Sequence, residues 1–242
     1  MIDRDPTGTD RTAERPRDGR AGRGTERSGV VKTGTTTVAL RGTDGVVLAA
    51  DARASLGGRF VANREMRKVE PIGERAAVAF AGGVADAQAF VRRLRSEARL
   101  YELEHGREPT VEALATVAGG LVRSGAFPVL ELLIGGVDPD GASAVFTVDR
   151  GGGVMAAPYA AGGSGMQLAY GALEGDYRED RDVAALRDVA ARAVESATER
   201  DAASGDGATV ATIRAAPETG DAAFDLDRYG SVAEFVAGEE VA

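Results

Sequence analysis

Few residues in this chain of 242 can act as nucleophiles. The chain has no cysteine, which excludes thiolate nucleophiles, disulfides, iron–sulfur clusters and thiolate zinc sites. It has one histidine, His105, so a site with several histidine ligands is excluded and a Ser–His–Asp triad would have to use His105. A serine or threonine nucleophile therefore needs another base. One solution is the α-amine of the nucleophile's own residue, which requires that residue to be the first of the active chain.

A run of threonines offers such a nucleophile. Thr35, Thr36 and Thr37 follow Gly34 at the point where a polar segment gives way to the first predicted strand. Cleavage between Gly34 and Thr35 would give Thr35 an α-amine, which titrates near pH 8. Gly34 has no side chain, which would let the Thr35 hydroxyl approach the preceding carbonyl in an unusual backbone geometry. Threonines also favour strands, so this run by itself favours a purely structural role.

The second chemical signal is a lysine. Only two of the 29 basic residues are lysines, Lys32 and Lys68. A buried lysine can have its pKa tuned, whereas arginine stays protonated in proteins. Lys68 is therefore a candidate functional residue, although its survival in an arginine-rich composition could also be chance.

Charge and hydropathy restrict the partners. The net charge is −9, with −11 on residues 35–242, and an acidic surface of this kind opposes binding to nucleic acid. An acidic, lysine-poor surface suits a very salty cytoplasm, where screening weakens self-repulsion. No apolar run of about 18 residues predicts a membrane span. The first thirty residues lack the apolar core of a secretory signal, so we expect a cytoplasmic location.

The elements that position these residues follow from the spacing of apolar residues. Residues 1–30 are almost devoid of apolar side chains and are predicted to be disordered. The predicted strands are 36–40, 45–50, a hairpin over 53–61, 67–72, 76–81, 129–137, 142–148, 153–160, 209–213 and a weaker 222–226. The predicted helices are 86–104, a segment with Thr110 as its N-cap, 166–176 and 182–199. The acidic tail from Tyr229 is predicted to be loose.

The order of these elements predicts the fold class. Runs of strands and pairs of helices are segregated along the chain instead of alternating one by one. This order favours an α+β architecture, in which helix pairs cover two packed antiparallel sheets.

Several stretches of the chain resemble the proteasome β subunit family, most closely its archaeal type. The first is Gly-Thr-Thr-Thr-Val at 34–38, and another is Lys-Val-Glu-Pro-Ile at 68–72. Further stretches lie at 45–55, 81–88, 161–165 and 199–205. Each stretch is weak alone, but their common order over residues 34–213 is specific.

The resemblance implies a fold, an activity and partners. The implied fold is a four-layer αββα sandwich of the N-terminal nucleophile hydrolase class. Residues 1–34 would be a propeptide, and residues 35–242 a single catalytic domain with a variable tail from about 215. The implied activity is that of a threonine endopeptidase, which hydrolyses unfolded polypeptides without a cofactor or metal. The implied partners are other β subunits in heptameric rings, stacked between rings of α subunits that receive substrate from an ATPase ring.

The resemblance also implies roles for individual residues. Thr35 corresponds to the nucleophile, Asp51 to the partner of Lys68, and Gly82 to a backbone oxyanion donor. The set that orients the terminal amine corresponds to Ser164, Asp201 and Ser204. The residue that aligns substrate as an added strand corresponds to Ser55. The specificity pocket, expected to accept hydrophobic residues, corresponds to Ala54, Met66, Phe80 and Val84.

Plainer explanations remain for these positions. Asp51 could be a turn residue after a strand, and Gly82 a strand end. Ser164 could cap a helix or belong to a phosphate-binding loop. Asp201 and Ser204 could simply close a helix. His105 is expected at a solvated helix end.

Other proteins of the family or fold would also fit. One alternative is a structural β subunit that fills a ring position without processing or catalysis. Another is a simpler ring protease or an amidohydrolase of the same fold. A further alternative concerns a single residue: Arg67, and not Lys68, could be the cation near the nucleophile.

Overall fold

The computed structural model describes residues 34–215 and 222–238, so the predicted disorder of residues 1–30 lies outside the described residues. The first half contains β1 (Thr36–Arg41), β2 (Gly45–Asp51), β3 (Ala54–Leu56), β4 (Phe60–Asn63), β5 (Val69–Ile72), β6 (Ala76–Ala81), α1 (Val84–His105) and α2 (Val111–Arg123). The second half contains β7 (Glu131–Val137), β8 (Ser143–Val148), β9 (Val154–Ala156), β10 (Tyr159–Gly163), α3 (Met166–Asp176), α4 (Val183–Thr198), β11 (Ala208–Ala215), β12 (Ala222–Tyr229) and α5 (Val232–Ala237).

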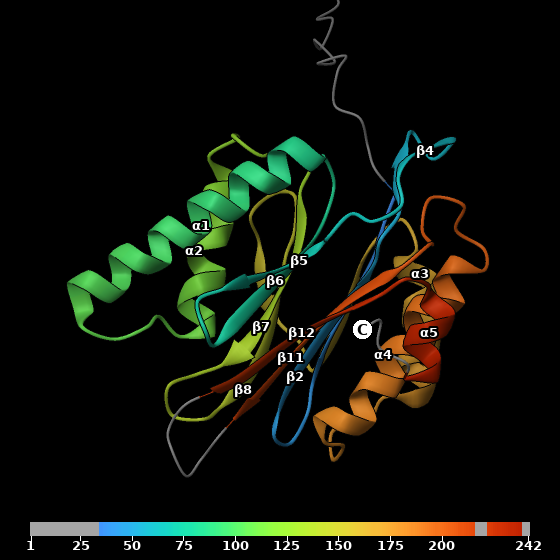
Figure 1. Cartoon of the computed structure of the whole chain (residues 1–242). Coiled ribbons are helices and arrows are strands. Elements are labelled where there is room, and N and C mark those ends of the chain that lie inside the picture. Colours follow the sequence, from blue (N-terminus) through green and yellow to red (C-terminus); the bar gives the residue numbers. More distant parts are fainter. Residues whose placement is uncertain (1–33, 216–221, 239–242) are drawn as a thin grey trace, which may run out of the picture.

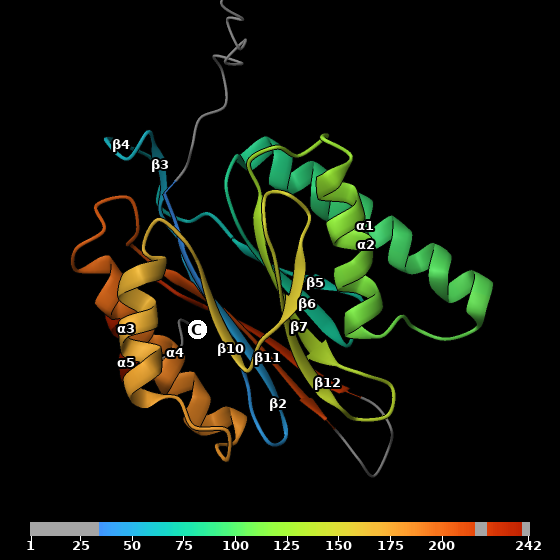
Figure 2. The ribbon, with the colours of Figure 1, turned by 180° about the vertical axis from the view of Figure 1, so that it is seen from behind.

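The strands form two antiparallel five-stranded sheets that pack face to face. One sheet has the order β10-β1-β2-β11-β12, and the other has the order β5-β6-β7-β8-β9. Helices α1 and α2 cover the outer face of the second sheet, and α3, α4 and α5 cover the outer face of the first (Figures 1 and 2). The β3–β4 hairpin projects at one end of the sandwich. The predicted four-layer αββα arrangement is confirmed.

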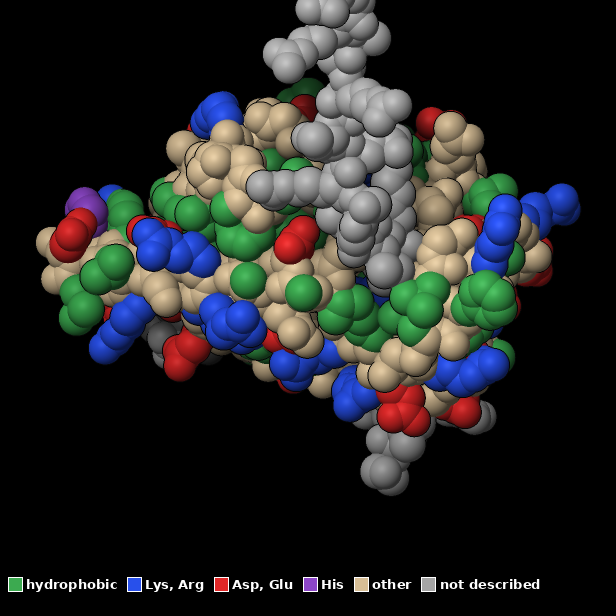
Figure 3. All heavy atoms as spheres, turned by 90° about the horizontal axis from the view of Figure 1, so that it is seen from above, with side chains coloured by type: hydrophobic (Ala, Val, Ile, Leu, Met, Phe, Trp, Pro, Cys, Tyr) green, Lys and Arg blue, Asp and Glu red, His purple; other side chains and the backbone are tan. Residues whose placement is uncertain are grey.

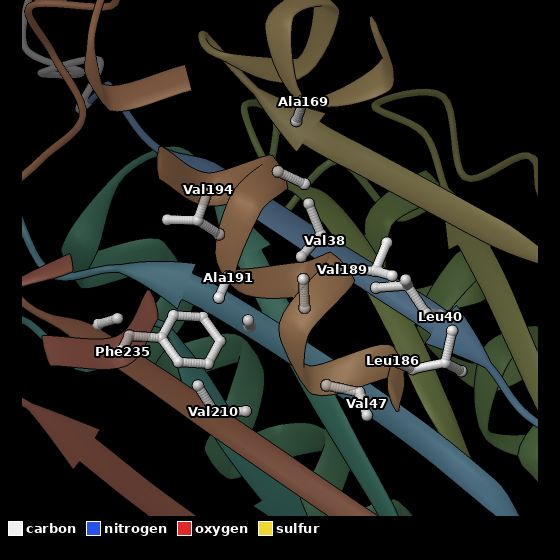
Figure 4. Packing of buried hydrophobic residues seen from close by; sticks show 14 of the residues in the cluster. Val38, Leu40, Val47, Ala169, Leu186, Val189, Ala191, Val194, Val210 and Phe235 are labelled. Atoms are coloured by element: carbon white, nitrogen blue, oxygen red, sulfur yellow. The ribbon is translucent and has the colours of Figure 1, made fainter. Parts of the chain in front are cut away.

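The layers are held together by apolar faces on both sides of each sheet. Strand β2 is buried at every position because it lies between the helix layer and the other sheet. Its Leu48 points into the core between the sheets, whereas Val47 packs under α4. Figure 4 shows α4 residues, among them Leu186 and Val194, on strand residues of the first sheet. These two cores fix the ends of β1 and β2, where the candidate nucleophile and Asp51 lie.

Helix α1 projects well beyond the sheet that it covers. Its buried residues, from Ala87 to Leu94, all lie in its first half, and its last residue is His105. Figure 3 shows this single histidine, in purple, at the edge of the molecule. The expected solvated helix end is confirmed, because His105 is exposed and its Nδ1 lies 2.9 Å from the Tyr101 carbonyl oxygen of the same helix.

Two predicted elements differ from the structure. The strand predicted over 153–160 is two strands, since β9 pairs with β8 in one sheet and β10 pairs with β1 in the other. Pro158 lies between them, where the chain changes sheets, because proline has no backbone N–H for a sheet ladder. The tail predicted to be loose forms α5, whose first turn is fixed by a capping box between Ser231 and Glu234.

None of the described helices is both long enough and apolar enough to cross a membrane.

Candidate active site

Thr35 lies immediately before β1, at the end of the sandwich from which the β3–β4 hairpin projects. It is 1% exposed. The bond to Gly34 is intact, and the Thr35 hydroxyl donates to the Gly34 carbonyl oxygen at 2.6 Å. The Gly34 N–H donates to the side-chain oxygen of Ser55 in β3 at 3.0 Å. The candidate cleavage point is thus fixed on both sides.

Asp51 and Lys68 form a buried ion pair beside this junction. Lys68 Nζ lies 2.9 Å from Asp51 Oδ1 and 3.5 Å from the Gly34 carbonyl oxygen. The Asp51 carboxylate also accepts the backbone N–H groups of Thr36, Arg53 and Gly205. Asp51 is the last residue of β2, and its side chain therefore does more than close a turn. These contacts hold one cation close to the carbonyl that the Thr35 hydroxyl also contacts.

Burial controls the charge of this pair. It raises the pKa of the Asp51 carboxyl, and it lowers the pKa of the Lys68 ammonium. In each case the partner's opposite charge counteracts the shift. Arg67, the alternative cation, is not part of the pair, because its guanidinium binds Glu70. The structure thus places Lys68, and not Arg67, next to Asp51.

Three predicted polar residues meet on the other side of Thr35. The Thr35 N–H donates to Ser164 Oγ at 3.0 Å, and Ser164 Oγ donates to Asp201 Oδ2 at 2.5 Å. The same carboxylate oxygen accepts the hydroxyl of Ser204 at 2.7 Å. Ser164 does not cap α3, whose N-cap is Gly165 without a side-chain hydrogen bond. The three residues therefore form one connected network at the Thr35 nitrogen.

Gly82 follows β6 directly and has a φ of 138°, which a side chain disfavours. A Cβ at this position would overlap the Val129 carbonyl oxygen. A Cβ on Gly163 would overlap the Thr35 carbonyl oxygen and lie 3.3 Å from the Cβ of Ala81. The residue before Gly82 thus lies close to Thr35, and both glycines are required by the local backbone.

Two further groups at this end of the sandwich escaped the sequence analysis. Arg53 Nε donates to Asp206 Oδ2 at 2.8 Å, and Arg53 Nη1 donates to the Ala202 carbonyl at 2.9 Å. Glu131 accepts the Gly163 N–H at 3.3 Å and is paired with Arg150. Arg53 lies within the family motif at 45–55, but its partner Asp206 is 153 residues further along the chain, so the sequence did not indicate the pair. Nothing in the sequence near Glu131 indicated its position.

A cavity of about 1000 Å³ adjoins the site, and it is lined by the four predicted pocket residues. Phe80 N–H donates to the Lys68 carbonyl, which connects the cavity wall to the buried pair. The lining also contains charged side chains, namely Glu65, Arg67, Glu70, Asp86, Arg92, Arg95 and Arg228. The cavity is thus more polar than the sequence indicated. Within residues 34–215 and 222–238, no group of three acidic or histidine side chains is arranged to hold a metal ion.

Comparison with known proteins gives one family. The profile described as "Proteasome subunit" matches residues 31–213. The "Proteasome subunit beta" of Halorhabdus utahensis is 50% identical over 184 residues, which cover 76% of this chain and 78% of that protein. The "Proteasome subunit beta 2" of Haloterrigena turkmenica is also 50% identical, covering 76% and 77%. The "Proteasome subunit beta 2" of Haloarcula marismortui is 47% identical, covering 78% and 82%. This chain therefore belongs to the proteasome subunit family and is similar to the β subunits of haloarchaea.

Proposed function

We propose that the chain is a catalytic β subunit, a threonine endopeptidase that activates itself by cleaving the bond between Gly34 and Thr35. The observation that carries the proposal is the convergence of the Thr35 hydroxyl and the Lys68 ammonium on the Gly34 carbonyl oxygen. A nucleophile, a cation and a polarised carbonyl are then assembled before any substrate arrives.

Self-cleavage follows from this geometry. The Thr35 oxygen attacks the Gly34 carbonyl carbon, and the positive charge of Lys68 stabilises the developing oxyanion. The C–N bond breaks, the nitrogen takes up the proton that the Thr35 hydroxyl gave up in the attack, and an ester joins Gly34 to the Thr35 oxygen. Water then hydrolyses the ester and leaves a carboxylate on Gly34 and a free amine on Thr35. Thr35 is 1% exposed with its bond to Gly34 uncut, and we propose that substrate reaches it after this step.

Turnover would use the same groups. The freed amine of Thr35 lies at the network of Ser164, Asp201 and Ser204, where it can accept the hydroxyl proton. The lowered pKa of Lys68 favours proton exchange nearer neutrality than an ordinary lysine allows. The backbone N–H of Gly82 is proposed as the oxyanion donor. The hydroxyl of Ser55, which holds Gly34 N–H here, would hold substrate backbone after cleavage.

The Asp201 network gives a specific prediction. Asp201→Asn keeps the shape of the side chain but removes the negative charge that accepts two hydroxyls. We expect kcat for a fluorogenic peptide to fall by about 10²-fold, because the amine loses its electrostatic support as a base. The Tm of the variant should stay close to that of the wild type. Unchanged kcat would remove Asp201 from the proposed machinery.

Mass spectrometry of assembled, peptidase-active particles tests the function as a whole. We expect the subunit to begin at Thr35. Active particles that retain residues 1–34 would contradict the proposal. Particles that contain the uncleaved chain and lack peptidase activity would instead support a structural subunit.

The cavity beside the site is proposed to receive the substrate side chain next to the cleaved bond. Its wall combines Ala54, Met66, Phe80 and Val84 with charged residues, so the preference should extend beyond apolar side chains. The proposed setting is the cytoplasm, in rings with other β subunits between rings of α subunits. The acidic surface suits high salt, and dialysis to low salt should weaken assembly.

A further inference from the structure

We propose that Ala203 restricts position 34 to glycine and thereby determines the sequence at which the chain cleaves itself; this rests on the self-cleavage proposed above. The restriction is one of space. A Cβ built on Gly34 would overlap the Ala203 Cβ and lie 2.9 Å from its Cα, closer than ordinary contacts of 3.4–4 Å.

Ala203 cannot move away easily, because its loop is fixed on each side. Its N–H donates to Asp201 Oδ1 at 3.1 Å. The preceding carbonyl, of Ala202, accepts the Arg53 guanidinium at 2.9 Å. The Ser204 N–H donates to the Asp201 carbonyl at 3.0 Å. A shift of Ala203 would therefore disturb the residues proposed to orient the terminal amine.

Gly34 is equally constrained. Its N–H is held by Ser55, and its carbonyl oxygen is held by the Thr35 hydroxyl and by Lys68. A side chain at position 34 would push this peptide away from Ala203 and so displace the carbonyl that Thr35 must attack. A misplacement of about 1 Å can slow a reaction by about 10²-fold. A side chain at position 34 should therefore slow the cleavage between residues 34 and 35.

A double-mutant cycle tests this contact. Full-length wild-type, Gly34→Ala, Ala203→Gly and doubly substituted chains are assembled, and leader removal is followed over time by intact mass spectrometry. We expect Gly34→Ala to slow removal by about 10²-fold. Adding Ala203→Gly to Gly34→Ala should raise the rate of leader removal by at least about tenfold. The rate should stay below that of the wild type, because the Cα of residue 203 remains close to the new side chain. Ala203→Gly alone should process at a rate close to that of the wild type.

The matched control is Ala202→Gly, the same substitution at the exposed neighbour in the same loop. It should not rescue Gly34→Ala. Equal rescue by Ala202→Gly would attribute the effect to general loosening of the loop and overturn the assignment to Ala203. A double variant as slow as Gly34→Ala would overturn it as well.

A second measurement does not depend on cleavage. In a Thr35→Ala chain, which keeps its leader, Gly34→Ala should lower the Tm by roughly 5 °C, and Ala203→Gly should restore part of it. A Gly34→Ala chain as stable as its parent would contradict the steric contact. A wild-type chain that never cleaves after Gly34 would contradict the proposed function, while this stability cycle would still test the contact.

Discussion

Replacing Thr35 with alanine should abolish both leader removal and peptide hydrolysis. The variant keeps the backbone of β1 and loses the γ-methyl group and the hydroxyl, whose oxygen lies 2.6 Å from the Gly34 carbonyl oxygen. Without a nucleophile, only substrate binding and oxyanion contacts could assist hydrolysis, so we expect kcat to fall by at least about 10⁴-fold. Fluorogenic peptide assays and intact mass measure the two losses separately.

The matched control for this variant is Thr35→Ser, which keeps the hydroxyl and should retain measurable processing and turnover. Thr35→Ala should still assemble, because no strand contact is removed. A Thr35→Ala particle with undiminished peptidase activity would show that the nucleophile lies elsewhere.

The second large effect is expected at Lys68. Lys68→Met keeps much of the volume but leaves the fully buried Asp51 carboxylate without its cation. Breaking a buried ion pair in this way costs about 3–5 kcal/mol, which corresponds to roughly 10 °C in Tm. Peptide hydrolysis should also be lost, since the variant lacks the ammonium that lies beside the Gly34 carbonyl and the Thr35 hydroxyl. Urea unfolding and a peptidase assay measure the two effects.

Two further variants separate charge from proton transfer. Lys68→Arg keeps a cation for Asp51 and should be more stable than Lys68→Met, yet it should not cleave peptides, because arginine does not release its proton. Combining Lys68→Met with Asp51→Asn removes both charges and should recover part of the lost stability, without activity. Full turnover in Lys68→Arg would show that a fixed positive charge is sufficient.

The stability of Lys68→Met should also depend strongly on pH. Burial already raises the pKa of Asp51 above its ordinary value of 3.8, and losing the opposite charge of Lys68 raises it further. A carboxyl whose pKa is raised by folding costs stability as pH rises above the ordinary value. The stability deficit of the variant relative to wild type should therefore shrink as the pH falls toward 3.8, the ordinary pKa of Asp51. A deficit independent of pH would show that Asp51 is not left charged and buried.

The sequence predicted the αββα layers and the pairing of Asp51 with Lys68, because both can be inferred from short stretches of the chain. Segregated strand runs and helix pairs indicated the αββα order, and family motifs brought Asp51 and Lys68 together. Two local signals were missed. Pro158 marked the break in the strand predicted over 153–160, and Ser231 with Glu234 marked the start of α5.

Contacts between distant parts of the chain could not be predicted in the same way. Arg53 and Asp206 are 153 residues apart, and neither residue type nor spacing shows that β3 lies against the loop before β11. The overlap between positions 34 and 203 is of the same kind. The sequence indicated that Gly34 lets the Thr35 hydroxyl approach the preceding carbonyl, but it gave no sign of the contact with Ala203, a neighbour that only the folded chain provides.

The hydrogen bonds from Thr35 to Ser164, and from Ser164 to Asp201, already exist while the leader is attached. If the chain works as proposed, we expect these contacts to persist after cleavage, so that processing needs no further conformational search. The lag between folding and first turnover would then be the duration of an acyl shift and an ester hydrolysis. Its temperature dependence should be that of covalent chemistry, with the nearly linear Arrhenius plot that refolding reactions lack.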